Sequence, residues 1–331
     1  MIWALYLMLG VNMWWDEYEK VDFDDDAWEK IVEEVKASGL NTIVLDLAEG
    51  VQYKSHPEIA HPGAWSTDRV RAEVKRLREM GITLIPKMNF SATHHLWLGK
   101  YRKMMSTDIY YDVCKDLIKE VYELFDHPEY IHLGMDEEGN TRILRYEQNF
   151  VSFRRGELLF HDLKFLCDCV KETGAKPWIW SDNYNDHTEE FKKYIDTENI
   201  LLSPWYYHAI KKEHFRKISD MQMYVDFYSQ PLFKDLDITY VEEDPALAFS
   251  RNHTISVTED GYDVVPTAST FNKNEYNADD LVDHYKTNAK KERVKGFMTA
   301  PWVHTTNENV EEIIKGIRLL ADAKNKYYKG E

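Results

Sequence analysis

Short apolar segments alternate with longer amphipathic segments along most of the chain. The apolar segments are almost continuously hydrophobic, as expected for parallel strands that are covered by helices. They lie at 3–11, 42–47, 82–88, 130–135, 176–181, 199–204, 263–268 and 295–301. The amphipathic segments repeat apolar residues at spacings of three and four, which predicts helices. These predicted helices span 26–38, 67–80, 108–125, 155–173, 279–292 and 307–325.

Eight strands that alternate with helices predict a (β/α)₈ TIM barrel, and we assign the whole chain, 1–331, to this one domain. An open doubly wound sheet is the alternative, but no glycine-rich phosphate-binding loop follows any of the strands. The region 206–260 is longer than an ordinary connection between a strand and a helix. We therefore expect it to form an elaborated loop over the face that carries the site.

Composition and charge narrow the classes of partner. The formal net charge of −17 argues against nucleic acid, because phosphate binding needs clustered Lys and Arg. No run of apolar residues is long enough for a membrane span. The opening "MIWALYLMLGV" does not have the features of a signal peptide, and the sequence leaves the compartment open between cytoplasmic and exported with the leader missing. The sequence does not indicate an oligomeric state.

Polar and aromatic residues follow the predicted strands at their carboxyl ends, where a barrel of this kind carries its active site. In strand order they are Asp46 and Glu49, then Asn89, His94 and His95, then Asp136 and Glu137, then Trp180, Asp182 and Asn183, then Trp205 and Tyr206, then Asn272, and finally Trp302 and His304. A sugar ring has apolar C–H faces and hydroxyl edges, so its sites combine aromatic side chains with carboxylates and amides. This combination indicates a carbohydrate-binding site.

The end of the fourth strand carries three consecutive carboxylates. Side-chain alternation directs His132, Gly134 and Asp136 inward, and Glu137 is the first loop residue. Two adjacent carboxylates repel, so one of them tends to keep its proton, as a general acid requires. A solvated turn is the alternative, and the spacing alone leaves both open. Glu138 is expected to be a solvated loop charge.

The stretch "IHLGMDEEG" resembles the HxGGDE signature of glycoside hydrolase family 20, the β-N-acetylhexosaminidases, with Met135 in place of the second glycine. The stretches "VLDLAEGVQYKSHPEIAHPGAWS" and "GITLIPKMNFSATHH" are similar to the segments that follow the second and third strands of that family. "KPWIWSDNY", "GYDVVPTAS" and "KGFMTAPW" resemble its later elements. The resemblance covers nearly the whole chain, in the same order.

This resemblance implies substrate-assisted catalysis, in which the 2-acetamido oxygen of the sugar attacks C1. Glu137 would be the acid and base, Asp136 would orient the acetamido group, and Glu49 and His94 would form a relay behind Glu137. No cofactor or metal is implied. The expected sugar-binding residues are Trp180, Trp205, Trp302, Asp182, Asn89, Tyr206 and Asn272.

The sequence also departs from the family pattern. The family's first strand ends on an Arg that grips sugar hydroxyls, and here Met13 or a neighbour takes its place. Where the family has "PEID", this chain has "PKMN", residues 86–89. The family's assisting tyrosine has three candidates here, Tyr206, Tyr207 and Tyr276.

Two other functions remain open from the sequence. One is a metal-dependent barrel hydrolase that uses ligands drawn from His94, His95, His132, Asp136 and Glu137. The other is a barrel that binds sugar without cleaving it.

Overall fold

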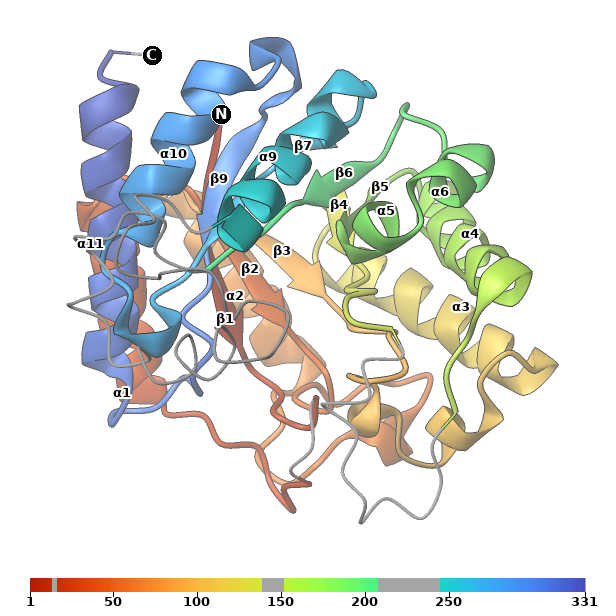
Figure 1. Ribbon diagram of the computed structural model, residues 1–331. Helices are drawn as coiled ribbons and strands as arrows, with labels where there is room; N and C mark the ends of the chain where they lie inside the picture. Colours follow the sequence, from red (N-terminus) through yellow and green to blue (C-terminus); the bar gives the residue numbers. More distant parts are fainter. Residues whose placement is uncertain (14–16, 139–151, 208–244, 331) are drawn as a thin grey trace, which may run out of the picture.

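The computed structural model describes residues 1–13, 17–138, 152–207 and 245–330 (Figure 1). Its centre is one sheet of parallel strands in the order β7-β6-β5-β4-β3-β2-β1-β9-β8. The strands are β1 Ile2–Met8, β2 Thr42–Asp46, β3 Thr83–Lys87, β4 Tyr130–His132, β5 Lys176–Trp180, β6 Leu201–Ser203, β7 Asp263–Val264, β8 Thr267–Ala268 and β9 Gly296–Thr299. Each of the eight predicted strands is present.

The strand predicted at 263–268 is divided into β7 and β8 because Pro266 interrupts it. On one side of this segment, the N–H groups of Val265 and Thr267 donate to carbonyls of β6 and of the residue that follows it. On the other side, the carbonyls of Val264 and Pro266 accept N–H groups from the chain at and just before β9. The segment therefore pairs with both neighbours and closes the sheet into a TIM barrel.

Helices surround the strands on the outside of the barrel (Figure 1). They are α1 Asp25–Ala37, α2 Thr67–Glu79, α3 Asp108–Leu124, α4 Gly156–Thr173, α5 Asp182–Asp186, α6 Thr188–Tyr194, α9 Pro245–Glu259, α10 Asn277–Asn288 and α11 Val310–Tyr327. Short 3₁₀ helices lie at Pro57–Ile59, Leu96–Met104, Phe271–Lys273 and Lys291–Arg293.

The helices form where the sequence pattern predicts them and end at local signals. In α1, the buried residues Trp28, Ile31, Val32 and Val35 form one face, and burying each contributes roughly 1.5–3 kcal/mol. The N-terminus of α2 is capped by Ser66, whose hydroxyl accepts the N–H of Arg69. No helix in the described part of the chain has the length and apolar character that a membrane crossing requires.

The region 206–260 differs from the expected elaborated loop in its last part. Residues 245–259 form α9, which contacts β7 and α5. A helix at this place is the regular partner of β6 in a β/α unit, so the connection is less irregular than its length suggested. Residues 208–244, which include the stretch "MQMYVDFYSQ", lie outside the described residues.

Candidate active site

Asp136 and Glu137 lie on a turn of unusual backbone conformation directly after β4. Gly134, Met135 and Glu137 all have positive φ angles, of 70°, 67° and 53°. For a residue other than glycine this conformation costs of order 1–3 kcal/mol, and it persists only where the surroundings hold it. A Cβ atom at Gly134 would overlap the side chain of Asn89, so only glycine fits there.

Asn89, at the end of β3, holds this turn. Its Oδ1 accepts the backbone N–H groups of Ser91 at 3.1 Å and of Met135 at 3.2 Å. Its Nδ2 donates to Oδ1 of Asp136 at 2.8 Å. The structure thus assigns Asn89 contacts with the turn and with the carboxylate, and a contact with sugar stays a prediction.

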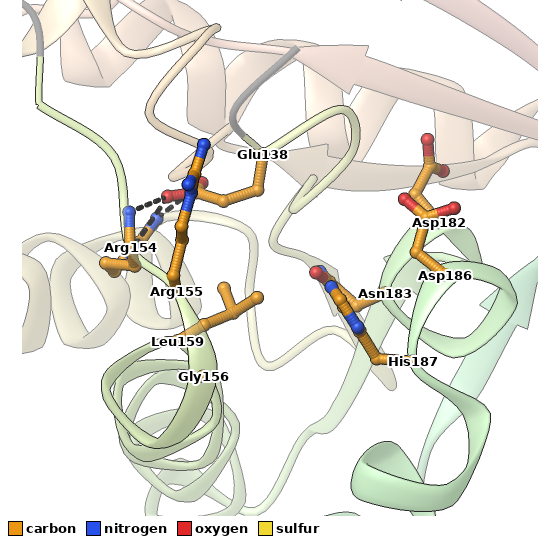
Figure 2. Close-up of a pocket in the computed structure, with 9 residues that line it drawn as sticks. All are labelled: Glu138, Arg154, Arg155, Gly156, Leu159, Asp182, Asn183, Asp186 and His187. Carbon is orange, nitrogen blue, oxygen red and sulfur yellow. Dashed lines mark hydrogen bonds and ion pairs between the residues drawn. The ribbon is translucent and has the colours of Figure 1, made fainter.

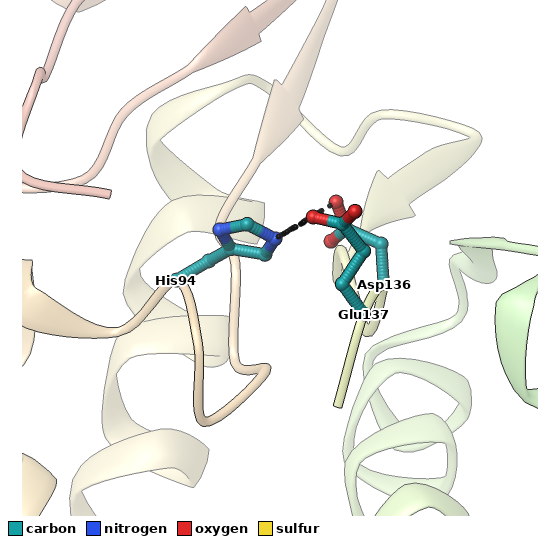
Figure 3. A group of neighbouring side chains, drawn as sticks. All are labelled: His94, Asp136 and Glu137. Atoms are coloured by element: carbon teal, nitrogen blue, oxygen red, sulfur yellow. Dashed lines mark ion pairs between the residues drawn. The ribbon is translucent and has the colours of Figure 1, made fainter. Parts of the chain in front are cut away.

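His94 joins the two carboxylates, as Figure 3 shows. Its Nε2 lies 3.2 Å from Oδ2 of Asp136 and 3.2 Å from Oε2 of Glu137. The His94 side chain is only 1% exposed, and burial alone would lower its pKa, but the two carboxylates outweigh burial and raise the pKa to about 9. Burial would raise the pKa of Asp136, yet His94 together with Lys87 and Asn89 holds it below the usual range. His94 is therefore a cation and Asp136 an anion at neutral pH.

The five residues considered as metal ligands do not come together as one set. The ligand atoms of His94, Asp136 and Glu137 lie within 4.8 Å of one another, but among the described residues neither His95 nor His132 belongs to this group. His132 Nδ1 instead accepts the backbone N–H of the glycine two residues later. Burial lowers the pKa of His95 to about 3, so that ring is neutral.

Asp182, the second residue after β5 and the first of α5, approaches the same turn from the other side. Its Oδ1 accepts the N–H of Glu137 at 3.2 Å, and its Oδ2 accepts Nε1 of Trp205 at 2.9 Å. Burial, followed by the charge of Asp136, raises the pKa of Asp182 to about 8. Asp182 therefore keeps its proton at neutral pH and adds no third negative charge to the pair.

Aromatic residues line the barrel beside the carboxylates. Trp302 has a positive φ of 56°, and its ring centroid lies 4.6 Å from that of Tyr6, 5.6 Å from that of Trp180 and 6.3 Å from that of Tyr207. Trp205 stacks on Tyr207 at 4.9 Å. The three predicted tryptophans thus gather in one aromatic cluster, and Tyr207 belongs to it.

Tyr206 is a correction to the expected set of sugar-binding residues. It is buried, and its hydroxyl donates to Oδ2 of Asp280 on α10, away from the cluster. Burial raises the pKa of Tyr207, and the nearby carboxylates of Asp136 and Glu137 add to this rise. Alternation along this extended segment was the available signal, because it places position 207 on the same side as Trp205.

Two other predicted residues contribute less to the described site. The carboxylate of Glu49 accepts the N–H of Val11 at 2.7 Å and that of Asn12 at 3.2 Å, so it holds the loop after β1. The relay from Glu49 to His94 stays a prediction. The side chain of Asn272 lies outside the described part of the structure.

Glu138 is buried, which corrects the expectation of a solvated charge. Its side chain is 2% exposed, and its oxygens accept Nε and Nη2 of Arg154, each at 3.0 Å. It also accepts the N–H of Ala92 at 2.7 Å. Burial would raise the pKa of Glu138, but Arg154 holds it below its ordinary value. Arg154, a residue that the sequence analysis missed, therefore anchors the loop after β4 to the loop after β3.

A second buried ion pair lies within the barrel on neighbouring strands. Lys87 at the end of β3 binds Oδ2 of Asp46 at the end of β2, with 1% and 0% of the two side chains exposed. The Tyr6 hydroxyl donates to the same oxygen at 3.0 Å. Lys87 is one of the three residues that depart from the family's "PEID", and its positive charge helps to lower the pKa of Asp136.

Comparison with solved structures gives the same fold. The chain is similar to a β-N-acetylhexosaminidase from Bacteroides fragilis, at 14% identity and a TM-score of 0.62, with 96% of this chain and 65% of that one covered. It is also similar to an exo-β-N-acetylglucosaminidase from Vibrio harveyi, at 12% identity and a TM-score of 0.61, with 97% and 53% covered. A Streptomyces plicatus β-hexosaminidase matches at 12% identity and a TM-score of 0.61, with 98% and 68% covered.

This chain thus spans about two thirds of the length of the Bacteroides fragilis protein and about half of the length of the Vibrio harveyi protein. A search among curated proteins found no match. The model of the family described as "Glycosyl hydrolase family 20, catalytic domain" matches residues 56–323, which is most of the chain. With the Asp136–Glu137 pair at the end of β4 of a TIM barrel, this match shows that the chain belongs to glycosyl hydrolase family 20.

Proposed function

We propose that this protein is a retaining exo-β-N-acetylhexosaminidase that removes terminal β-linked GlcNAc, GalNAc or a related 2-acetamido sugar. The observation that carries the proposal is the Asp136–Glu137 pair, held at the end of β4 by the His94 cation in a member of this family. A sugar-binding protein without catalysis would have no use for a strained turn that presents two carboxylates around one imidazolium.

In the first step, the carbonyl oxygen of the substrate's 2-acetamido group attacks C1, and the bond between C1 and the glycosidic oxygen breaks. Glu137 gives its proton to that departing oxygen. Oε2 of Glu137 lies 3.2 Å from Nε2 of His94, beside Asp136 at the end of β4. The products are the free leaving group and a cyclic oxazolinium ion.

Asp136 orients the acetamido group and stabilises the positive charge that develops on its nitrogen. Each carboxylate oxygen has about two acceptor positions. Among the described residues, Asn89 occupies one position on Oδ1 and His94 lies against Oδ2, which leaves an acceptor position for the acetamido N–H. The low pKa of Asp136 keeps it ionised while this charge forms.

In the second step, the Glu137 carboxylate takes a proton from water, and the water oxygen attacks C1 and opens the ring. Two displacements at C1 give a product with retained configuration. The His94 cation stabilises Glu137 while it is negatively charged between the two steps. The neutral Asp182 beside the Glu137 N–H avoids a third charge that would oppose this state.

The experiment is paired hydrolysis of the 4-nitrophenyl β-glycosides of GlcNAc and GalNAc and of the matching 2-hydroxy sugars, with and without a chelator. We expect turnover of the 2-acetamido substrates only, at a rate that the chelator does not change. Equal turnover of the 2-hydroxy sugars would refute substrate assistance. Loss of activity with chelator would favour a metal-dependent reaction, and no turnover of any of the four would refute the proposed activity.

A further inference from the structure

Three buried charged side chains form a connected group between α4 and the turn after β4. Arg154 is the middle one, and its Nε donates to Oε1 of Glu138 at 3.0 Å, as Figure 2 shows. Its Nη1 lies 3.5 Å from Oδ2 of Asp162, a residue of α4. The hydroxyls of Ser106 and Tyr111 also donate to the Asp162 carboxylate, each at 2.6 Å. All three charged side chains are at most 2% exposed, and none of the catalytic steps above uses Arg154 or Asp162.

Arg154 also contacts the loop after β3, which carries His94. Its Nη2 donates to the carbonyl of Phe90 at 2.6 Å and to Oε2 of Glu138 at 3.0 Å. The same Glu138 oxygen accepts the N–H of Ala92 at 2.7 Å. One guanidinium and one carboxylate thus join the segment that precedes His94 to the residue that follows the proposed acid.

These two loops carry the two members of one contact in the site. Nε2 of His94 lies 3.2 Å from Oε2 of Glu137, and the two residues come from different loops. The hydroxyl of Thr93 adds a link, because it donates to the carbonyl of Glu137 at 3.0 Å. Glu137 has a φ of 53°, a conformation that persists only where the surroundings hold it. The position of its carboxylate therefore depends on the contacts that join the two loops.

A buried group of charges is better suited to fixing geometry than to adding stability. Removing one member leaves an uncompensated charge, but apolar side chains of similar volume often stabilise a protein as well as the whole group does. The guanidinium adds direction, since its N–H groups lie in one plane and fix the positions of their acceptors. Here the acceptors of Arg154 are a carbonyl of the loop after β3 and a carboxylate of the turn after β4.

We propose that Arg154 is a positioning residue for the reaction, because it sets the distance between His94 and Glu137. Asp162 holds the Arg154 guanidinium in place from the α4 side. The inference rests on the proposed function and adds to it a residue that does not touch the substrate, since Arg154 is 1% exposed. Proton transfer from Glu137 to the departing oxygen thus depends on Arg154, and binding of the sugar does not.

The test compares leaving groups that differ in their need for a proton. We would measure kcat and KM on phenyl β-GlcNAc, whose leaving group needs protonation, and on 2,4-dinitrophenyl β-GlcNAc, whose leaving group does not. The GalNAc pair replaces them if the wild type cleaves it faster. Circular dichroism would give the folded fraction of each variant, so that rates are compared per folded molecule.

Two variants change Arg154 without leaving the turn with an unpaired buried charge. Arg154→Lys keeps the positive charge and loses the planar set of donors. The double variant Arg154→Met/Glu138→Leu removes both charges of the pair, and Asp162 keeps its two hydroxyl donors. Arg76→Met is the matched control, because Arg76 on α2 also binds two carboxylates, those of Glu73 at 2.7 Å and Glu29 at 2.9 Å.

We expect both Arg154 variants to lower kcat on the phenyl glycoside by roughly tenfold or more, because a small misplacement of the acid is costly. On the dinitrophenyl glycoside the change should be less than about twofold, KM should be unchanged on both, and the control should match wild type. Equal losses of kcat on the two substrates, or no loss on the phenyl glycoside, would overturn the inference.

Crystal structures of the wild type and of Arg154→Lys give a readout that does not need turnover. The contact between His94 and Glu137 should be longer in the variant than the 3.2 Å given above. An unchanged contact would overturn the inference even if the wild type proves inactive. A wild type that hydrolyses no aryl 2-acetamido glycoside refutes the proposed function instead.

Discussion

The buried pair of Lys87 and Asp46 gives a prediction that joins stability to chemistry. Both side chains are almost fully inaccessible, and the Tyr6 hydroxyl is the other described donor to the carboxylate. Replacing Lys87 by Met leaves a buried carboxylate with one neutral hydrogen bond. Replacing Asp46 by Leu leaves a buried ammonium group whose carboxylate partner is gone.

The size of the effect follows from the cost of an uncompensated buried charge. Removing one partner of a buried ion pair costs about 3–5 kcal/mol, so the two single variants would sum to about 6–10 kcal/mol if they were independent. The double variant Lys87→Met/Asp46→Leu has no buried charge at this place and leaves the Tyr6 hydroxyl only a weak acceptor, Sδ of Met13 at 3.8 Å. The lost hydrogen bond of this buried hydroxyl costs at most about 1–3 kcal/mol. We therefore expect a coupling free energy of at least about 3 kcal/mol between the two positions.

The assay is urea unfolding at pH 7 for the wild type, both single variants and the double variant. Lys164→Met is the control, because the exposed pair Lys164–Asp168 joins residues four apart on α4 and contributes only about 0.3–0.5 kcal/mol. A double variant that loses the sum of the two single losses would refute the reasoning, since each side chain would then act through its own packing.

The same variants report on catalysis. The positive charge of Lys87 helps to keep the pKa of Asp136 low. Lys87→Met should therefore raise that pKa and move the acid limb of the kcat–pH profile to higher pH, because Asp136 acts as an anion. If the acid limb does not move, Lys87 does not influence the pKa of Asp136 during catalysis, and its role is limited to stability.

Three further substitutions test the site. Glu137→Gln should lower kcat by about 10²–10⁴ on substrates with poor leaving groups and much less on activated aryl glycosides, and equal losses on both would count against Glu137 as the acid. Glu138→Gln should lower the free energy of unfolding in urea by about 3–5 kcal/mol, because it breaks the buried pair with Arg154. The control Glu129→Gln, in an exposed pair with Lys176, should lower it by less than about 1 kcal/mol. Similar losses in the two variants would contradict the stabilising role of the buried Glu138–Arg154 pair. The pKa of His94 is raised to about 9, so the stability from its charge should be complete below about pH 6.5 and lost as the pH rises through about 9. His94→Gln should remove this loss, and a stability difference between wild type and variant that does not change with pH would contradict the His94 cation.

Most of the barrel follows from local patterns in the sequence. Near-continuous apolar runs mark the strands, and the spacing of Trp28, Ile31, Val32 and Val35 marks one helix face. Both signals come from residues close in sequence, so no knowledge of the tertiary fold is needed. The break at Pro266 also has a local cause, because proline has no N–H to donate to a neighbouring strand.

The site was less predictable because its geometry depends on contacts between distant segments. The sequence placed Asn89 among the sugar-binding residues, yet its side-chain hydrogen bonds join the loop after β3 to the turn after β4. Tyr206 and Tyr207 could be told apart by alternation, but only if the segment after β6 was assumed to stay extended. The position of a residue at the end of a strand therefore predicted that it lies near the site, but it did not predict which contact its side chain makes.

The three consecutive carboxylates after β4 show why the local sequence pattern could not predict which of them is buried. A charge is costly to bury, so a glutamate in a loop is reasonably expected to be solvated. Glu138 is buried because Arg154, sixteen residues away in the sequence, neutralises it and fills its acceptor positions. The left-handed backbone at Glu137 lets consecutive side chains leave the turn in different directions, with Glu137 toward His94 and Glu138 toward Arg154. Glu137 can thus stay beside His94 as the proposed acid because Glu138, in its buried ion pair with Arg154, holds the turn in place.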